Sequence, residues 1–308
     1  TEIRTQTGNN SPFNYRLVPY ISGSDHTVFL PAGIPAMQFN HWPDNFYHSS
    51  ADVAERTDPT EMKRVGFIGA SSFYYLAIAE ADEAMDLAWA SSAGGEKWMA
   101  EVTRQSVRLM NAGASEIHDR YKAAHNKVFG AFNRGKGSLS SVTDLAADAD
   151  VSSLVRSLTE ILAISRDAQY KKLEGVYVAR ARELGIATRP LTATGEEEEW
   201  DRMVPRRLYN FYTDEHRDAS SRLRQLLPGG MSLPRLASTE IPWFVNGERS
   251  VTEIWRLVRA EYGNVTTSSD PWKFAYVVTP DTPDVQIGDV VAYLRAMEEA
   301  GMVEIQRR

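Results

Sequence analysis

Apolar residues recur three and four positions apart along most of the chain after Asp58, the spacing of one face of an α-helix. Asp58 or Thr60 can cap a helix that the pattern continues to about residue 87. Further long helices are expected over 98–128 and 151–184, and Gly185 is well placed to end the last one. The pattern therefore predicts a region of long helices, two of which pair as an antiparallel hairpin.

Small and polar residues interrupt this periodicity. The run SSAGG at 91–95 is expected to separate two helices. The run NRGKGS at 133–138 is expected to end the second of them, the helix over 98–128. Before Asp58 the apolar runs are short, as in IPAMQF at 34–39, and turn residues bound them. This part of the chain therefore predicts short strands and loops.

The carboxy-terminal third is less regular. Residues 188–234 predict a helix or two within an irregular linker, and 241–247 predict a short strand and a turn. Ser250 can cap a helix, a second helix is expected over 285–300, and 301–305 can form a closing strand. This order of elements is similar to a winged-helix module, although the pattern is common.

Composition narrows the possible functions. The chain has 308 residues, of which 43% are hydrophobic and 24% charged, as in a soluble globular protein, and no apolar run is long enough to span a membrane. It contains no cysteine, which excludes disulfides, thiolate metal sites and a cysteine nucleophile. A metal site must therefore use histidine and carboxylate ligands.

Charge argues against nucleic acid as a partner. The formal net charge is −7, and from Val251 to Arg308 nine acidic residues outnumber six basic ones. Nucleic acid and anionic lipid attract basic surfaces, so the expected winged module favours a structural or protein-binding role over DNA binding.

The densest chemistry lies near the amino terminus. Its segments are GSDH at 23–26, GIPA at 33–36, YHSSAD at 47–52 and DP at 58–59. In this order and spacing they resemble the carboxy-terminal part of the catalytic domain of the M28 family of zinc peptidases. The resemblance implies an α/β fold, with a mixed sheet flanked by helices, followed by a helical region and the winged-helix-like module. The expected domains are 1–92, 93–235 and 236–308.

The same resemblance implies that His48 is a metal ligand. A neutral imidazole on a loop is a common zinc donor, so the residue type suits that role. Asp52, four residues further on, is expected to brace the loop or His48 itself.

Other residues near this histidine take roles by the same resemblance. Asp25 is expected close to the metal pair, orienting water or substrate as a catalytic residue, whereas Ser24 and His26 are expected to hold the turn. Phe46 and Tyr47 are expected to line the substrate pocket, and Trp42 is a further candidate.

A complete site of this family needs more than this chain offers. The resemblance implies two zinc ions, held by a His-x-Asp pair, a Glu, a second Asp and the final His, with another Glu as general base. Within this chain His216 and Asp218 have the His-x-Asp form, yet they sit in a strongly charged stretch that a solvated helix face explains better. His118 and His125 are seven residues apart and are expected to be surface histidines.

The chain is therefore expected to be incomplete as an enzyme. It begins at Thr1 without an initiator Met, which suggests a processed product or a piece of a longer chain. The other ligands are expected from an upstream fragment of the same precursor or from a second chain.

Two functions of different classes stay open at this point. The first is a zinc aminopeptidase that cleaves peptide substrates, forms a homo-oligomer and acts in an extracellular or periplasmic location, as the family resemblance implies. The alternative is a non-catalytic assembly or scaffold protein that retains a peptidase-like fold. Transcriptional regulation through the winged module is disfavoured by the charge balance. A preceding sequence that lacks the other metal ligands would favour the scaffold.

Overall fold

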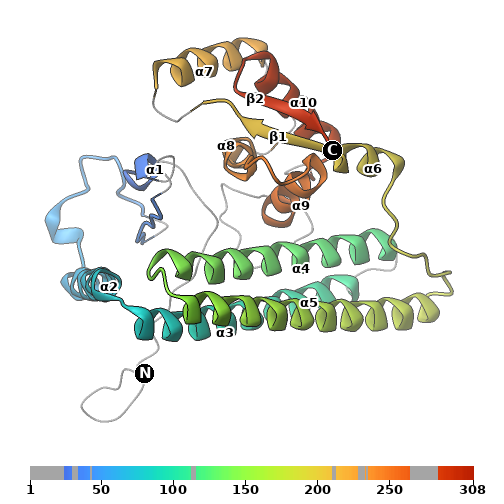
Figure 1. Cartoon of the computed structure of the whole chain (residues 1–308), viewed down its shortest axis with the longest axis horizontal. Helices are drawn as coiled ribbons and strands as arrows, with labels where there is room; N and C mark the ends of the chain where they lie inside the picture. The colour runs from blue at the N-terminus through green and yellow to red at the C-terminus, as the bar shows by residue number, and fades with distance from the viewer. Residues whose placement is uncertain are drawn as a thin grey trace.

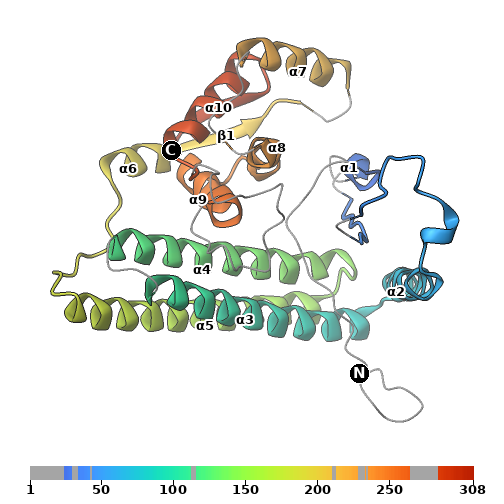
Figure 2. The same cartoon turned by 180° about the vertical axis from the view of Figure 1, so that it is seen from behind.

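A long helical bundle and a smaller carboxy-terminal module make up most of the molecule (Figure 1). The structure is a computed structural model that describes residues 24–29, 34–41, 44–111, 116–209, 213–227, 233, 235–263 and 284–308. The module lies along one side of the bundle, and a further helix, α2, lies at one end of it (Figures 1 and 2). No helix in these described ranges is both long enough and apolar enough to cross a membrane.

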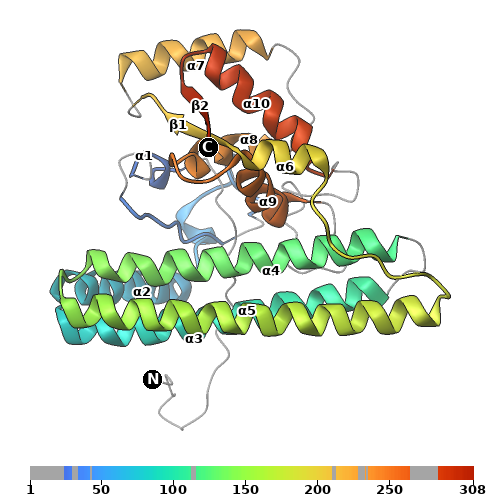
Figure 3. The same ribbon diagram turned by 45° about the vertical axis from the view of Figure 1, so that its right-hand side comes forward.

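The bundle consists of α3 (Ala81–Asn111), α4 (Ile117–Ser140) and α5 (Ala149–Glu183), with the short 3₁₀ helix η3 (Ser141–Asp144) between the last two. Figure 3 shows the three helices lying side by side. One buried cluster joins the beginnings of α3 and α5 and another joins their ends, so these two helices run parallel with α4 antiparallel between them. The predicted helix over 151–184 is confirmed, and Gly185 follows it with φ at +68°.

The expected break at 91–95 is wrong, because α3 continues through it. Gly95 faces Gly135 of α4, where a Cβ atom at Gly95 would lie 3.3 Å from the Gly135 Cα atom and 3.1 Å from Leu162 of α5. The expectation that 133–138 ends a helix is wrong for the same reason, since α4 runs past Gly135. These glycines allow the backbones of α3 and α4 to approach closely beside the Leu162 side chain of α5, and the cost of glycine in a helix is offset by that packing.

The reversal that sequence periodicity missed lies between α3 and α4. The helix predicted over 98–128 is two helices, because α3 ends at Asn111 and α4 begins at Ile117. Glu116 adopts a left-handed conformation with φ at +65°, which redirects the backbone immediately before α4. Both helices bury their apolar residues with the same period, so the period alone does not reveal the turn.

The helix α2 (Pro59–Ile78) begins as predicted but ends earlier than expected. The Asp58 carboxylate accepts hydrogen bonds from the backbone amides of Thr60 and Glu61. At the other end Ala79 is extended, and the Glu80 amide donates to the Glu83 carboxylate, which starts α3. Two residues thus separate the helices, and α2 itself has no buried residue.

The α/β prediction for the fold is wrong. The one sheet within the described ranges has two antiparallel strands, β1 (Met203–Arg207) and β2 (Val303–Arg307), and both belong to the carboxy-terminal module. Residues 34–41, which were expected to include a strand, form no strand and pair with no described strand. A lone extended segment leaves its backbone groups to water and gains no ladder hydrogen bonds, so alternation of residue types does not suffice for a strand.

The carboxy-terminal module has one core of its own, which draws residues from Ala219 to Val303. Its helices, beside the two strands, are α6 (Gly195–Asp201), α7 (Asp214–Leu226), α8 (Arg235–Phe244), α9 (Val251–Tyr262) and α10 (Ile287–Glu299). The strand expected at 241–247 is wrong: Ala237, Ile241 and Val245 are fully buried at four-residue spacing on and just after α8. The cap at Ser250 and the closing strand are confirmed.

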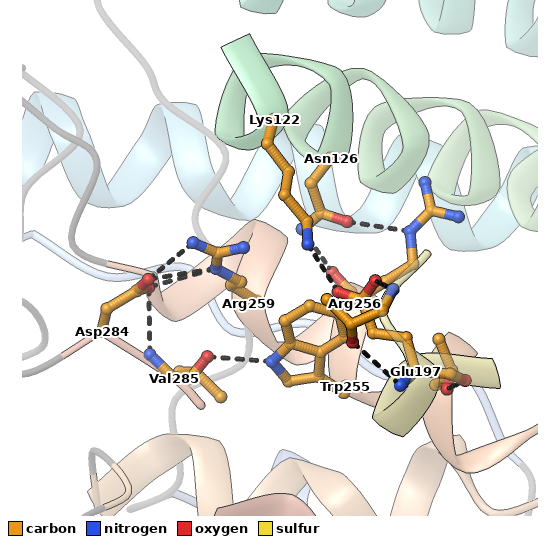
Figure 4. A network of polar contacts seen from close by, with 10 residues as sticks. Lys122, Asn126, Glu197, Trp255, Arg256, Arg259, Asp284 and Val285 are labelled. Atoms are coloured by element: carbon orange, nitrogen blue, oxygen red, sulfur yellow. Dashed lines mark hydrogen bonds and ion pairs between the residues drawn. The ribbon is translucent and has the colours of Figure 1, made fainter. Parts of the chain in front are cut away.

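Polar side chains attach the module to the bundle (Figure 4). Asn126 of α4 donates to the Arg256 carbonyl oxygen at 2.9 Å and accepts from the Arg256 guanidinium at 3.1 Å. Lys122 of α4 pairs with Glu197 of α6 at 2.7 Å, while the Arg256 guanidinium lies 3.7 Å from the centre of the Phe129 ring. These contacts are partly buried, and Asn126 and Arg256 each donate a hydrogen bond to the other. They therefore fix the positions of α9 and α6 along α4.

The predicted domains 1–92, 93–235 and 236–308 stay predictions. Two observations bear on how the chain is organised. The helix α3 is continuous across the first boundary, and the core of the carboxy-terminal module includes residues on both sides of the second.

We expect Gly135→Val to lower the free energy of unfolding by about 1–3 kcal/mol, because the new side chain overpacks the contact with Gly95 and Leu162. Gly137→Val is the matched control, since a Cβ atom at Gly137 meets nothing within 4 Å. Urea unfolding of both variants measures the difference. Equal stability of the two variants would show that the glycine contact is unimportant.

A buried carboxyl in the module should make stability depend on pH. Burial, with the nearby Glu261 carboxylate, raises the pKa of Glu240 from 4.5 to about 10, and Glu240 is only 5% exposed. The unfolded chain releases this proton near pH 4.5 and the folded chain retains it to about pH 10, so stability falls as pH rises between those values. Glu240→Gln should flatten the decline in unfolding free energy between about pH 6 and pH 9, by at most about 1.4 kcal/mol per pH unit. The exposed Glu248→Gln should leave the decline unchanged.

Candidate metal centre

A compact loop over residues 44–58 carries the predicted metal ligand. The Asp44 carboxylate accepts the Phe46 amide at 2.9 Å, and the Phe46 carbonyl oxygen accepts both the amide and the hydroxyl of Ser49. The Ser49 carbonyl then accepts the Asp52 amide. Successive turns of this kind brace the loop with its own atoms.

His48 lies at the centre of this loop with its side chain exposed. Its φ angle is +55°, in the left-handed region that residues with a Cβ atom rarely adopt. The imidazole stacks on the neighbouring Tyr47 ring, with centroids 3.8 Å apart and planes 19° apart. The loop therefore presents an exposed imidazole in a defined backbone conformation.

Phe46 is half-buried, and its ring contacts a residue near the other end of the loop. The Arg56 guanidinium lies 4.1 Å from the centre of the Phe46 ring, and Arg56 is the last residue of the short 3₁₀ helix η2 (Ala54–Arg56). Sequence reasoning missed the contribution of Arg56 and of Ser49. The Asp44 turn could have been inferred, because aspartate after proline commonly accepts a hydrogen bond from the backbone two residues on. The ring contact of Arg56 had no such local signal.

Asp52 holds the loop through its backbone, since its amide donates to Ser49. Within the described ranges no hydrogen bond joins the Asp52 carboxylate to His48, and its expected support of the imidazole stays a prediction. The candidate Trp42 lies outside the described residues.

The other predicted residues form a separate turn at α1 (His26–Phe29). The Ser24 carbonyl accepts the amide and the hydroxyl of Thr27, and the Asp25 carbonyl accepts the Val28 amide. Asp25 is exposed, whereas Ser24 and His26 are half-buried. The turn thus leaves the Asp25 carboxylate available to a partner, while the roles expected for these side chains stay predictions.

Three histidines outside this region are engaged in aromatic packing. His125 stacks on Tyr170 with centroids 3.6 Å apart, and burial lowers the pKa of His125 to about 4. His118 lies 3.2 Å from the Tyr177 hydroxyl, and His216 stacks on Tyr209. The expectation that His118 and His125 are surface histidines is therefore wrong, since both pack at the seam between α4 and α5.

Comparison with known proteins places the loop in a family. The sequence model of peptidase family M28 matches residues 2–72, a range that holds the His48 loop, α1 and most of α2. We call residues 2–72 the M28 segment, after the family whose sequence model they match. The match lies at the amino-terminal end of this chain, and the expectation that it is the end of a peptidase domain stays a prediction.

A relative of the M28 segment is a probable zinc metalloprotease from Pyrenophora teres f. teres (strain 0-1). The two are 34% identical over 86 residues, which is 24% of this chain and 18% of the relative. The chain therefore spans less than a fifth of the length of that protein. No solved structure gives a significant match to the chain.

The M28 segment contains a residue of the type and exposure that a metal ligand needs. His48 suits zinc, because its imidazole is exposed and its loop is fixed by local hydrogen bonds. Within the ranges that the structure describes, no three histidine, aspartate or glutamate side chains gather as a metal site needs. A zinc site requires at least three protein ligands, so His48 can serve only as one member of a set.

Proposed function

We propose that this chain is part of a zinc-dependent aminopeptidase, in which His48 supplies one metal ligand and residues outside the chain supply the others. The observation that supports this most is the presentation of His48, exposed on a self-braced loop within the M28 segment. The zinc metalloprotease relative supports the choice of metal.

The chemistry follows from a site of this type. Zinc, when bound, lowers the pKa of its water and polarises the carbonyl of a peptide bond. His48 contributes a ring nitrogen to the metal, and the fixed loop limits the orientations of that nitrogen. Tyr47 and Phe46 provide an aromatic surface beside it for a peptide substrate. Asp25 has an exposed carboxylate that can orient a water or an amine.

Exposed apolar side chains between residues 24 and 78 support the proposal that a partner covers this part of the chain. Met37 is 72% exposed, Phe73 is 73% exposed and Tyr74 is 68% exposed. From Val65 to Ile78 the helix α2 has no charged residue. Soluble proteins rarely expose many large apolar side chains on one helix, and Phe67, Phe73 and Tyr74 of α2 are all more than 60% exposed. We infer that an upstream fragment of the same precursor, or a second chain that completes the peptidase domain, covers it.

Two further features belong to this proposal. The family resemblance favours an extracellular or periplasmic location. Exposed apolar residues on the bundle, such as Trp89 of α3, favour a homo-oligomer in which the bundle contributes an interface.

The metal assignment predicts a loss of zinc from one variant. With the chain co-produced with its upstream fragment, we expect His48→Ala to lower bound zinc and to reduce hydrolysis of an aminoacyl substrate beyond the roughly 10–100-fold that loss of an outer metal-site partner costs. His41→Ala is the matched control, because His41 is exposed and lies before the loop. Elemental analysis and initial rates give the result. Equal, near-zero zinc with and without the fragment would exclude this function.

The partner assignment predicts where association is sensitive. Phe73→Glu should weaken binding of the upstream fragment by at least about tenfold, because burial of a phenylalanine contributes about 1.5–3 kcal/mol. Ile164→Glu is the control, since Ile164 is 69% exposed on α5, outside the M28 segment. Calorimetric titration of the two variants measures the difference. If both variants bind the fragment equally well, α2 is not the contact surface.

A further inference from the structure

The loop that carries His48 is closed by a contact between its two ends. The Arg56 guanidinium lies over the Phe46 ring, 4.1 Å from its centre, with His48 between them in sequence. We propose that Arg56 is a positioning residue, which clamps Phe46 and so holds His48 in the conformation that a metal site requires. The value of that conformation rests on the metal function proposed above.

Contacts within the loop contribute to its stability. Residues 47–60 are exposed throughout, so the loop gains little from burial against the rest of the described chain. The hydrogen bonds among Asp44, Phe46, Ser49 and Asp52 all join residues at most three apart. Such local bonds define each turn but do not fix the distance between the ends of the loop. The contact between Phe46 and Arg56 joins two described residues that lie ten positions apart.

The contact between Arg56 and Phe46 can stabilise the left-handed backbone conformation of His48. A left-handed φ angle at a residue with a Cβ atom is unfavourable and persists only where the surroundings hold it. Phe46 anchors the turn that precedes His48, because its carbonyl oxygen accepts two hydrogen bonds from Ser49. Fixing the Phe46 ring therefore fixes the turn in which His48 lies.

The guanidinium of Arg56 suits a contact with an aromatic ring. A planar guanidinium stacks on an aromatic face with more contact than an ammonium makes. Among the described residues Arg56 forms no ion pair, whereas the nearby Arg64 pairs with Glu61. The backbone amide of Arg56 donates to the Val53 carbonyl, which fixes the start of its side chain relative to the loop.

The test uses nuclear magnetic resonance on the full 308-residue chain with labelled histidine, without metal. Stacking on Tyr47 shifts the His48 ring protons upfield, so their shift reports the population of the closed loop. The His48 signals are identified by their loss in His48→Gln. Arg56→Gln and Phe46→Leu should each reduce the closed population relative to the open one by about two- to fivefold. Arg56→Lys should fall between wild type and Arg56→Gln.

Arg64→Gln is the matched control, because it removes the same charge from an exposed arginine outside the loop. Unchanged signals from His118, His125 and His216 show that each variant remains folded. If Arg56→Gln and Phe46→Leu leave the His48 shifts where Arg64→Gln leaves them, the clamp does not exist.

A second measurement separates the clamp from the metal function. In the chain assembled with its upstream fragment, zinc should move the His48 signals, and Arg56→Gln should weaken zinc binding by about two- to fivefold. If zinc leaves the wild-type His48 signals unchanged, the metal function fails while the effect of Arg56 on the loop stands. If Arg56→Gln opens the loop and leaves zinc affinity at the Arg64→Gln value, the positioning role is overturned.

Discussion

Close packing of α3, α4 and α5 is the constraint on which the rest of the arrangement depends. Gly95 and Gly135 bring two helix backbones within reach of the same Leu162 side chain, which aligns the three helices along their length. The bundle then supports both other parts of the molecule. The carboxy-terminal module attaches through Asn126 and Lys122 of α4, and α2 joins the beginning of α3 through two residues. The M28 segment is thus joined directly to the bundle through the short link between α2 and α3.

The sequence was a good guide wherever the deciding contacts are local. Ser250 caps a helix as predicted, and so does Asp58, one of the two candidates at its position, because each side chain accepts hydrogen bonds from amides two or three residues further on. Gly95 was misread because its role depends on Gly135, forty positions away, and on a third helix. The segment at 241–247 was misread because its apolar residues fit a short strand and a buried helix equally well. Distant partners decided both cases, and no local pattern contains them.

At the candidate site, too, the sequence predicts the features that depend on local contacts and misses those that depend on distant ones. The M28 resemblance was found from short segments with fixed spacing, and residues 2–72 confirm it. The fold implied by that resemblance was wrong for the described chain, since a mixed sheet needs several strands beside one another and only β1 and β2 pair here. His48 and its turn are local and could be located from the sequence. The ring contact of Arg56 depends on the path of ten residues, which spacing does not give.

The parts of the chain differ in how much apolar surface they bury. The bundle and the module each enclose a core, whereas α2 has no buried residue although most of its residues are apolar. A helix of this kind gains stability only when another surface covers it, because apolar area in water provides no packing energy. This exposed helix lies largely within the range that matches the M28 family model, for which we propose a partner. The partner that we propose would supply both the further metal ligands and the surface that covers α2, because His48 and α2 lie close together in the chain.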